Sequence, residues 1–127
     1  MQPDPHEFGR VAERLAVAFL ERQAYRIVAV NQRVGRGEID IIARKGTVLA
    51  FVEVKARRTR TCGAPEDAVT PRKQRQIARL AALWLGSHPR RLQGVTDVRF
   101  DIVAVDALAR PPRIRHLRAA FDASPRA

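Results

Sequence analysis

Residues 37–55 read GEIDIIARKGTVLAFVEVK, and this stretch decides the fold that we expect for the chain. Two apolar runs flank the KGTV segment at 45–48, whose glycine is the first of two central residues, as in a type II′ hairpin turn. In that hairpin the numbers of facing residues sum to 93, so Asp40 faces Glu53 across the two strands. Lys55 lies two residues beyond Glu53 and shares its face of the sheet. Two facing carboxylates repel each other, so the pattern indicates a cation site with a positive partner.

Asp40 and Glu53 offer the oxygen ligands that a hard cation such as Mg²⁺ or Mn²⁺ prefers, and Glu38 is a second-rank ligand on the same face. The alternative is a surface hairpin whose Lys and Glu form a cross-strand salt bridge on the solvated face. The apolar run around Asp40, IDIIA, argues against that alternative. The interpretation depends on the register, because a shift of one residue would send Asp40 and Glu53 to opposite faces.

The remaining pattern places helices and further strands around this hairpin. Apolar residues at helical spacing predict a helix over about 6–23, and Thr70 with Pro71 is a good start for a second helix that continues to about Gly86. Further strands are expected at 25–30, 98–105 and 113–117, with loops at 31–37 and 86–96. This order predicts an α/β fold with a central mixed β-sheet of about five strands flanked by α-helices. The first three strands would form an antiparallel meander, and the second helix would cross over to deliver the fourth strand.

The composition is that of one soluble domain. With 127 residues, 46% of them apolar, the chain can bury a substantial core, and we expect a single domain over 1–127 with its core at about 6–121 and a frayed tail at 122–127. No apolar run approaches the length of a membrane span, and the N-terminus lacks the apolar core of a secretory signal. Cys62 is the only cysteine, which excludes an internal disulfide and a cysteine-cluster zinc site. We therefore expect a cytoplasmic protein.

The formal net charge of +11 predicts a nucleic-acid partner, with DNA as our first expectation, because such a field attracts polyanions. All but three of the 24 basic residues are arginines. A GC-rich genome would explain this preference for arginine, but not the excess over 13 acidic residues. For the basic loop after the hairpin, a purely solvated role is an equal alternative. The arginines that we expect to contact nucleic acid flank the hairpin or begin the second helix: Arg33, Arg36, Arg57, Arg58, Arg60, Arg72 and Arg75.

Asp40 followed by Glu53-Val54-Lys55 resembles the motif of the PD-(D/E)xK nuclease superfamily. Within that superfamily, the whole chain looks like the YraN family of small bacterial proteins, which are related to Holliday junction resolvases. The resemblance extends over about residues 6–121. It rests on five segments, namely GxxAExxAxxFL at 9–20, GEIDII at 37–42, FVEVK at 51–55, TPRK at 70–73 and RFDIV at 99–103.

This resemblance implies a restriction-endonuclease-like core and assigns roles to the hairpin residues. Asp40 and Glu53 become metal ligands, and Lys55 becomes the catalytic lysine. In the resolvase-like nucleases a glutamate of the N-terminal helix joins them. Glu13, which by its place on the helix reads as a solvated carboxylate, therefore becomes a catalytic residue and a metal ligand.

Two further positions bear on the resemblance. Either Lys73 or Gln74 matches the polar residue that the following helix often contributes in the superfamily. Ile39 precedes Asp40 where proline stands in the motif, a departure that is common among divergent members.

Three functions are compatible with this sequence. The first is a Mg²⁺-dependent endonuclease that cuts DNA, including branched DNA, by in-line attack of water on a phosphodiester. The second is a non-catalytic nucleic-acid-binding protein that keeps the same fold, and the third is a structural or adaptor protein. The intact set of Glu13, Asp40, Glu53 and Lys55 favours the first over the second. A homodimer would suit a junction substrate, because two sites can cut symmetric strands.

Overall fold

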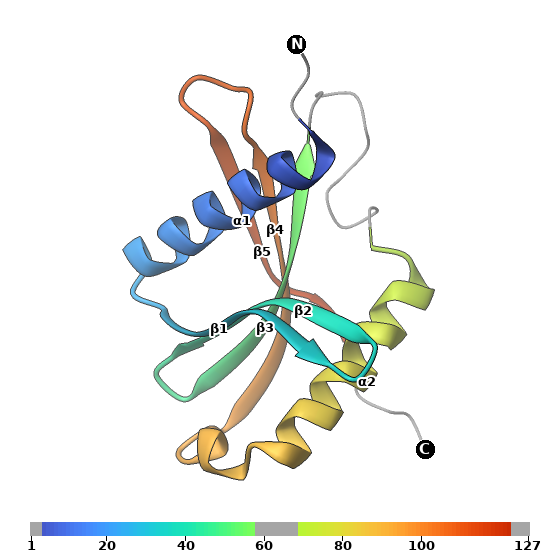
Figure 1. Ribbon diagram of the computed structural model, residues 1–127. Coiled ribbons are helices and arrows are strands. Elements are labelled where there is room, and N and C mark those ends of the chain that lie inside the picture. Colours follow the sequence, from blue (N-terminus) through green and yellow to red (C-terminus); the bar gives the residue numbers. More distant parts are fainter. Residues whose placement is uncertain (1–3, 58–68, 123–127) are drawn as a thin grey trace.

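One five-stranded mixed sheet, in the order β1-β2-β3-β4-β5, organises the computed structural model, which describes residues 4–57 and 69–122 (Figure 1). Neighbouring strands are antiparallel except β3 and β4, which are parallel. The elements follow the chain as α1 (Pro5–Arg22), β1 (Arg26–Val34), β2 (Gly37–Lys45), β3 (Val48–Arg57), α2 (Pro71–Ser87), the 3₁₀ helix η2 (Pro89–Leu92), β4 (Asp97–Asp106) and β5 (Arg113–Phe121). The structure confirms the predicted α/β class, the meander and the crossover through α2, an arrangement consistent with a restriction-endonuclease-like core.

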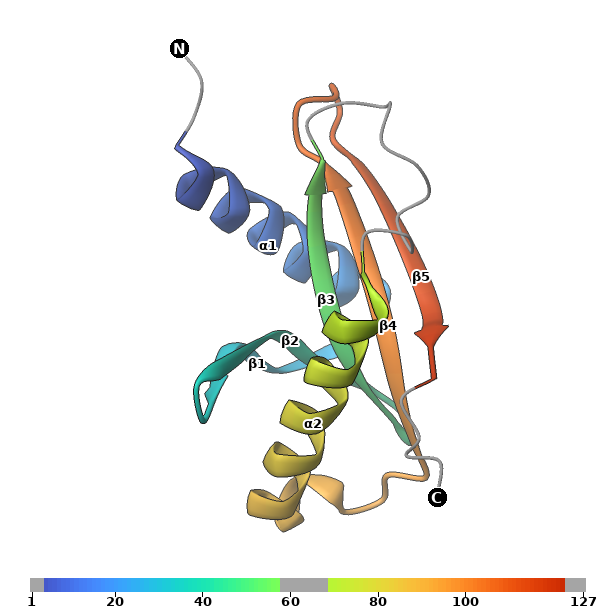
Figure 2. The same cartoon turned by 90° about the vertical axis from the view of Figure 1, so that its right-hand side faces the viewer.

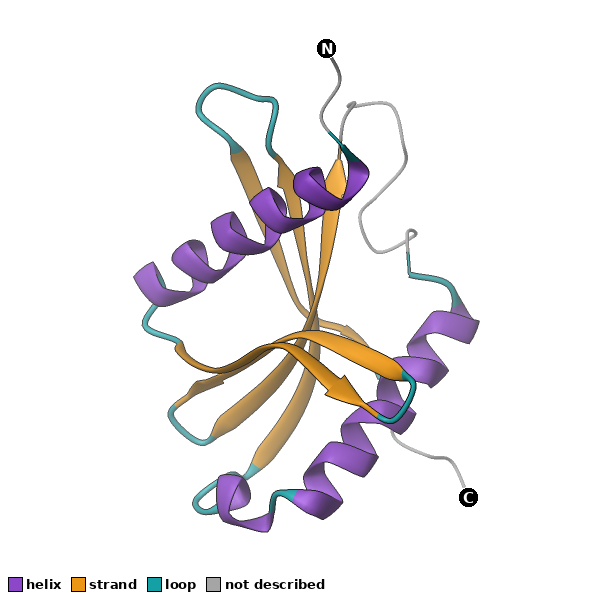
Figure 3. Ribbon diagram, viewed as in Figure 1, coloured by secondary structure: helices purple, strands orange, loops and turns teal. Residues whose placement is uncertain are grey.

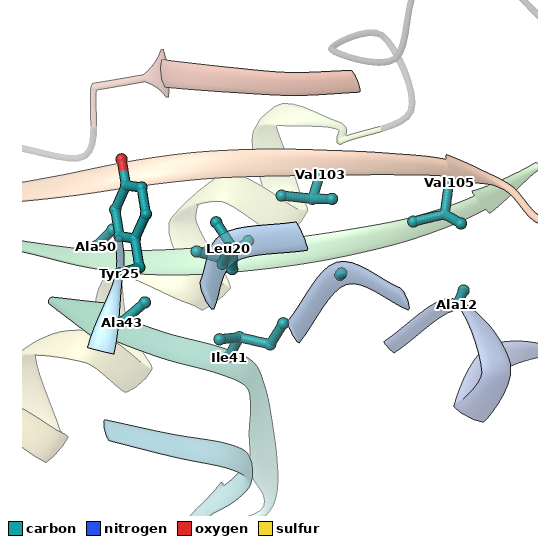
Figure 4. Packing of buried hydrophobic residues seen from close by; sticks show 10 residues of the cluster. Ala12, Leu20, Tyr25, Ile41, Ala43, Ala50, Val103 and Val105 are labelled. Carbon is teal, nitrogen blue, oxygen red and sulfur yellow. The ribbon is translucent and has the colours of Figure 1, made fainter. Parts of the chain in front are cut away.

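The two helices cover opposite faces of the sheet (Figure 3). The apolar stripe of α1 packs on the face that carries Ile41 and Val52, while α2 packs on the face that carries Ile42 and Phe51. Adjacent residues of a strand point to opposite faces, so one apolar run supplies both halves of the core. Figure 4 shows the first half, where side chains of α1 meet those of three strands and of Tyr25, the residue before β1: Ala12, Leu20, Tyr25, Ile41, Ala43, Ala50, Val103 and Val105.

Both helices begin where the sequence predicts, because each has a side-chain cap. Asp4 accepts a hydrogen bond from the main-chain N–H of His6 (3.1 Å), and Thr70 accepts one from that of Lys73 (3.2 Å). Trp84 of α2 is only 2% exposed and packs edge-on against Phe51, as expected for a core residue. No helix within residues 4–57 and 69–122 is long and apolar enough to cross a membrane.

The β2–β3 hairpin has the predicted register. The pairs run from Lys45 with Val48 to Ile41 with Val52, and Gly46 has the positive φ of +60° that the turn requires. Beyond Ile41 the two strands separate. Figure 2 shows β1 and β2 turning away from β3, which continues past them.

The chain departs from the prediction at the end of β1. Residues 31–34, which we expected in a loop, continue β1 because they pair with β2 as far as Val34 with Gly37. The connection is therefore only the turn at Gly35 and Arg36, and Gly35 has φ +56°. Pro89–Leu92 forms a 3₁₀ helix inside another expected loop, and β5 extends to Phe121.

Some expectations lie outside the described residues. They concern most of the loop after β3, with Arg58, Arg60 and Cys62, and the tail from 123 to 127. For Arg57 the structure describes the main chain alone. The single domain over 1–127 remains a prediction.

Candidate metal centre

Three carboxylates from two elements meet where β2 leaves β3. Glu13 of α1 and Glu38 and Asp40 of β2 each offer an oxygen, and these oxygens lie within 4.8 Å of one another. Glu13 follows the fully buried Ala12, so its side chain emerges beside the apolar stripe and reaches the strand below α1. We call these three residues the acidic cluster.

The side chain of Asp40 continues the hydrogen bonding between β2 and β3 beyond the last paired residues of the two strands. Its Oδ2 accepts a hydrogen bond of 2.9 Å from the main-chain N–H of Val54 in β3. Ile39 and Ile42 both pack on the α2 side, so the strand's strict alternation breaks at this point. The carboxylate of Asp40 is thereby fixed at the opening between the two strands.

Asn31 is a member of the site that the sequence interpretation missed. It lies in β1 with a left-handed φ of +52°, between the pairs that join Val30 to Ile41 and Gln32 to Ile39. With its amide nitrogen facing the acidic cluster, Asn31 donates to Oε2 of Glu13 and to Oε1 of Glu38 (2.9 Å for the latter). The signal was available in the register, because Asn31 stands opposite Asp40 once β1 is extended to Val34.

Glu53 lies next to the acidic cluster, among lysines. Nζ of Lys55 is 3.6 Å and Nζ of Lys73 is 3.9 Å from its Oε1, and Glu53 is 8% exposed. Of the two helix candidates, Lys73 therefore reaches the site. The side chain of Gln74 instead donates to the main-chain carbonyl of Val69 (2.9 Å).

Burial and mutual repulsion raise the pKa values of these acids. For Glu53, burial and then the charge of Asp40 raise the pKa from 4.5 to about 7, against the opposing effect of Lys73 and Lys55. Burial also raises the pKa of Asp40, although the Val54 hydrogen bond counteracts it. Burial, Asp40 and Glu38 together raise the pKa of Glu13. Such a group of acids is costly unless a cation offsets it.

The predicted nucleic-acid contacts lie around this site on exposed positions. Arg33 and Arg36 are at the β1–β2 turn, and Arg72 and Arg75 are on the first turns of α2. All four side chains are exposed. These cations are therefore exposed on the surface, as is Glu38, while Glu13, Asp40 and Glu53 are partly or largely withdrawn from water.

The comparisons with known proteins identify the family. The model described as "Uncharacterised protein family UPF0102" matches residues 12–105. A UPF0102 protein of Geobacter sulfurreducens is 50% identical over 117 residues, which cover 90% of this chain and 88% of that protein. A second, from Geotalea uraniireducens, is 43% identical over 122 residues, covering 94% and 92%.

The chain belongs to the UPF0102 family. The resemblance to the YraN family is thereby confirmed. Among solved structures, the chain is similar to SfsA of Pyrococcus furiosus in complex with Ca²⁺, at 17% identity and a TM-score of 0.36. That alignment covers 91% of this chain and 64% of the longer SfsA chain.

This UPF0102 chain also buries a second carboxylate, away from the acidic cluster. Asp101 of β4 is fully buried, and its oxygens accept hydrogen bonds from Arg99 (2.8 Å twice), His116 (2.8 Å) and the main-chain N–H of Ala119 (3.0 Å). Arg99 also donates to the hydroxyl of Tyr25 (2.6 Å). Burial alone would raise the pKa of Asp101, but the bonds from His116, Arg99 and Ala119 lower it. We interpret this fully bonded group as a structural tie between β4, β5 and Tyr25, the residue that precedes β1.

Proposed function

We propose that this chain is a metal-dependent endonuclease that hydrolyses phosphodiester bonds in DNA. The observation that carries the proposal is the convergence of Glu13, Glu38 and Asp40 within 4.8 Å beside the Glu53–Lys55 pair. Three carboxylates in one place repel one another unless a cation lies between them, and a lysine next to them provides the positive partner for a phosphate. The proposal includes a single cytoplasmic domain as its setting.

The residues present fit a hard divalent cation. Their donors are carboxylate oxygens alone, Asp40 is held in place by Val54, and burial raises the pKa values of Asp40 and Glu13, so that a positive charge would stabilise their ionised forms. Asp40 and Glu13 would hold Mg²⁺ or Mn²⁺, with Glu38 and Glu53 as the further carboxylates within reach. When bound, such an ion lowers the pKa of a coordinated water and polarises a phosphoryl oxygen.

Lys55 and its neighbours would act directly on the substrate. The ammonium group of Lys55, 3.6 Å from Glu53, can donate to a non-bridging phosphate oxygen and offset the charge that develops during in-line attack by water. Glu53 fixes the position of this ammonium, and Lys73 shares the same carboxylate. Glu13 and Asp40 orient the attacking water through their oxygens.

The charge of the chain supports a nucleic-acid substrate. Arg33, Arg36, Arg72 and Arg75 are exposed around the site, and with Arg57, Arg58 and Arg60 they form the proposed contacts to the phosphate backbone. For a branched substrate, a homodimer would present two such sites to symmetric strands.

Cleavage of a panel of labelled DNAs tests this function. Linear, flapped and four-way DNAs are incubated with Mg²⁺ or Mn²⁺ and the wild type, Asp40→Asn, Lys55→Ala or the control Asp97→Asn, which changes an exposed acid on β4. We expect cleavage by the wild type and by the control, with losses of at least about 100-fold for the other two variants. Equal activity in all four proteins would mean contamination, and no activity in any would leave a protein that binds without cutting.

A further inference from the structure

A second group of like charges lies at the other end of the β1–β2 pair. Arg26 begins β1 and stands directly opposite Arg44 of β2 in the antiparallel register. Arg90 and Arg91 of η2 line the same hollow, which has a volume of about 520 Å³. We call it the distal arginine hollow and define it by Arg26, Arg44, Arg90 and Arg91.

Facing arginines destabilise a strand pair unless an anion lies between them. Within residues 4–57 and 69–122, none of the four guanidinium groups of the hollow lies within ion-pair distance of a carboxylate. The sequence agrees with this lack of carboxylate partners, because residues 68–96, which include Arg90 and Arg91, contain no Asp or Glu. Genome composition explains the choice of arginine over lysine, but not the assembly of four unpaired cations around one hollow.

One of the four arginines is held ready for a ligand. Arg44 is half-buried, and its Nε donates to the main-chain carbonyl of Gly46 at 2.9 Å. This bond occupies one edge of the guanidinium, and the other three arginines are exposed around the hollow. A fixed guanidinium beside exposed ones suits a phosphate, which accepts several charge-assisted hydrogen bonds at once.

Helix α2 connects the hollow with the acidic cluster. Its first turn carries Lys73, which contacts Glu53, and its end leads directly into η2 (Figure 2). At the usual rise per residue of an α-helix, its 17 residues extend for about 25 Å. Arg72, Arg75 and Arg79 line a second basic hollow of about 450 Å³ on this helix. Positive charge therefore lies on the first half of α2 and again in η2, which follows its end.

We infer that the distal arginine hollow is a second binding site for the phosphodiester backbone of a nucleic acid. This inference rests on the proposed function, because it places the scissile bond at the acidic cluster and another part of the same backbone in the distal arginine hollow. Along β2 from Asp40 to Arg44 the distance is about 13 Å, which corresponds to roughly four nucleotides of one strand. The substrate class is thus a polymer that occupies both sites, and not a mononucleotide.

Binding measured against salt tests the inference without any cleavage. Fluorescence anisotropy follows a labelled duplex DNA of about 30 base pairs, roughly three helical turns, and an RNA duplex of equal length, in EDTA. All proteins carry Asp40→Asn. One variant adds Arg90→Gln and Arg91→Gln. The matched control adds Arg115→Gln and Arg118→Gln, which remove the same charge from exposed positions on β5, the opposite edge strand.

We expect the η2 variant to bind about tenfold more weakly at 0.1 M salt, with the slope of log K against log salt reduced by about 2. The control should change the slope by less than about half a unit. The DNA and RNA arms show which backbone the hollow takes. If both variants lost affinity equally, the effect would come from net charge alone. If the η2 variant bound both nucleic acids as tightly as before, the hollow would not be a binding site. Either result overturns the inference. Arg26→Gln, at an exposed position, repeats the test if circular dichroism shows that the η2 variant is misfolded.

This experiment and the cleavage panel fail independently. A changed salt slope without cleavage by the wild type would refute the endonuclease and leave the hollow. Cleavage by the wild type with an unchanged slope in the η2 variant would refute the hollow and leave the endonuclease.

Discussion

The main-chain N–H of Val54 donates a hydrogen bond of 2.9 Å to Oδ2 of Asp40, where the ladder between β2 and β3 ends. The carboxylate thus closes the sheet and at the same time faces Glu13 and Glu38. Asp40→Asn keeps an acceptor for Val54, whereas Asp40→Ala leaves its N–H without that partner. We expect Asp40→Ala to be about 1–3 kcal/mol less stable than Asp40→Asn in urea unfolding, because an unsatisfied buried donor carries that cost. Equal stability of the two variants would show that this hydrogen bond does not stabilise the point at which β2 and β3 separate.

Glu53 predicts a pH dependence of stability in the metal-free protein. Its pKa is raised from 4.5 to about 7, so its contribution is fully present below pH 4.5 and is lost as the pH rises through 7. In EDTA we expect the free energy of unfolding to fall over this range by up to about 3 kcal/mol. Glu53→Gln, measured by urea unfolding at the same pH values, should flatten the curve. A wild-type curve that rises through this window would contradict the assignment.

Asp101 predicts a loss of stability from a single atom change. In Asp101→Asn the half-buried guanidinium of Arg99 loses its fully buried carboxylate partner, and we expect a cost of about 3–5 kcal/mol. Asp97→Asn, at an exposed position on the same strand, should cost less than about 0.5 kcal/mol. Because the pKa of Asp101 is lowered, its contribution to stability is lost only below about pH 4, outside the pH range in which Glu53 acts. Thermal unfolding of the two variants at pH 7 makes the comparison, and similar melting temperatures would show that the network is not a structural tie.

Gly37 and Gly86 form a matched pair of glycine substitutions. A Cβ on Gly37 would lie 2.6 Å from Cδ1 of the buried Leu80, so Gly37→Ala should destabilise the fold by about 1–3 kcal/mol. Gly86 lies within α2, with nothing within 4 Å of its added Cβ, and Gly86→Ala should stabilise the fold by about 0.5–1 kcal/mol. Opposite signs in urea unfolding are the expected outcome. Equal signs would mean that β2 does not pack closely on α2 at Leu80.

The sequence was sufficient for the hairpin and for most of the fold. A glycine turn between two apolar runs determines the register of Ile41 and Val52 with little ambiguity, and Thr70 with Pro71 determines where α2 begins. Local pattern failed at residues 31–34, because the segment 31–37, with two glycines and two arginines, resembles a loop even though pairing with β2 keeps its first four residues in a strand.

The members of the candidate site were less accessible to sequence reasoning. Glu38 ranked below Glu53 as a ligand, yet the acidic cluster contains Glu38 while Glu53 lies with the lysines. The alternation of β2 breaks between Ile39 and Ile42, and a prediction from a strict period of two does not include such a break. Glu13 was assigned to the site only through the family resemblance. It lies far from Asp40 in the sequence, so no local pattern predicts that the two residues meet.

Uptake of Mn²⁺ by the metal-free protein tests the central claim most directly. The signal of the free ion in electron paramagnetic resonance falls as Mn²⁺ binds, independently of any cleavage. We expect saturable binding to the wild type, retained in the control Asp97→Asn and weakened at least about tenfold in Asp40→Asn, which removes a central ligand charge. Mn²⁺ binding that is equal in Asp40→Asn and the wild type, or absent from both, would contradict a metal centre at Glu13, Glu38 and Asp40.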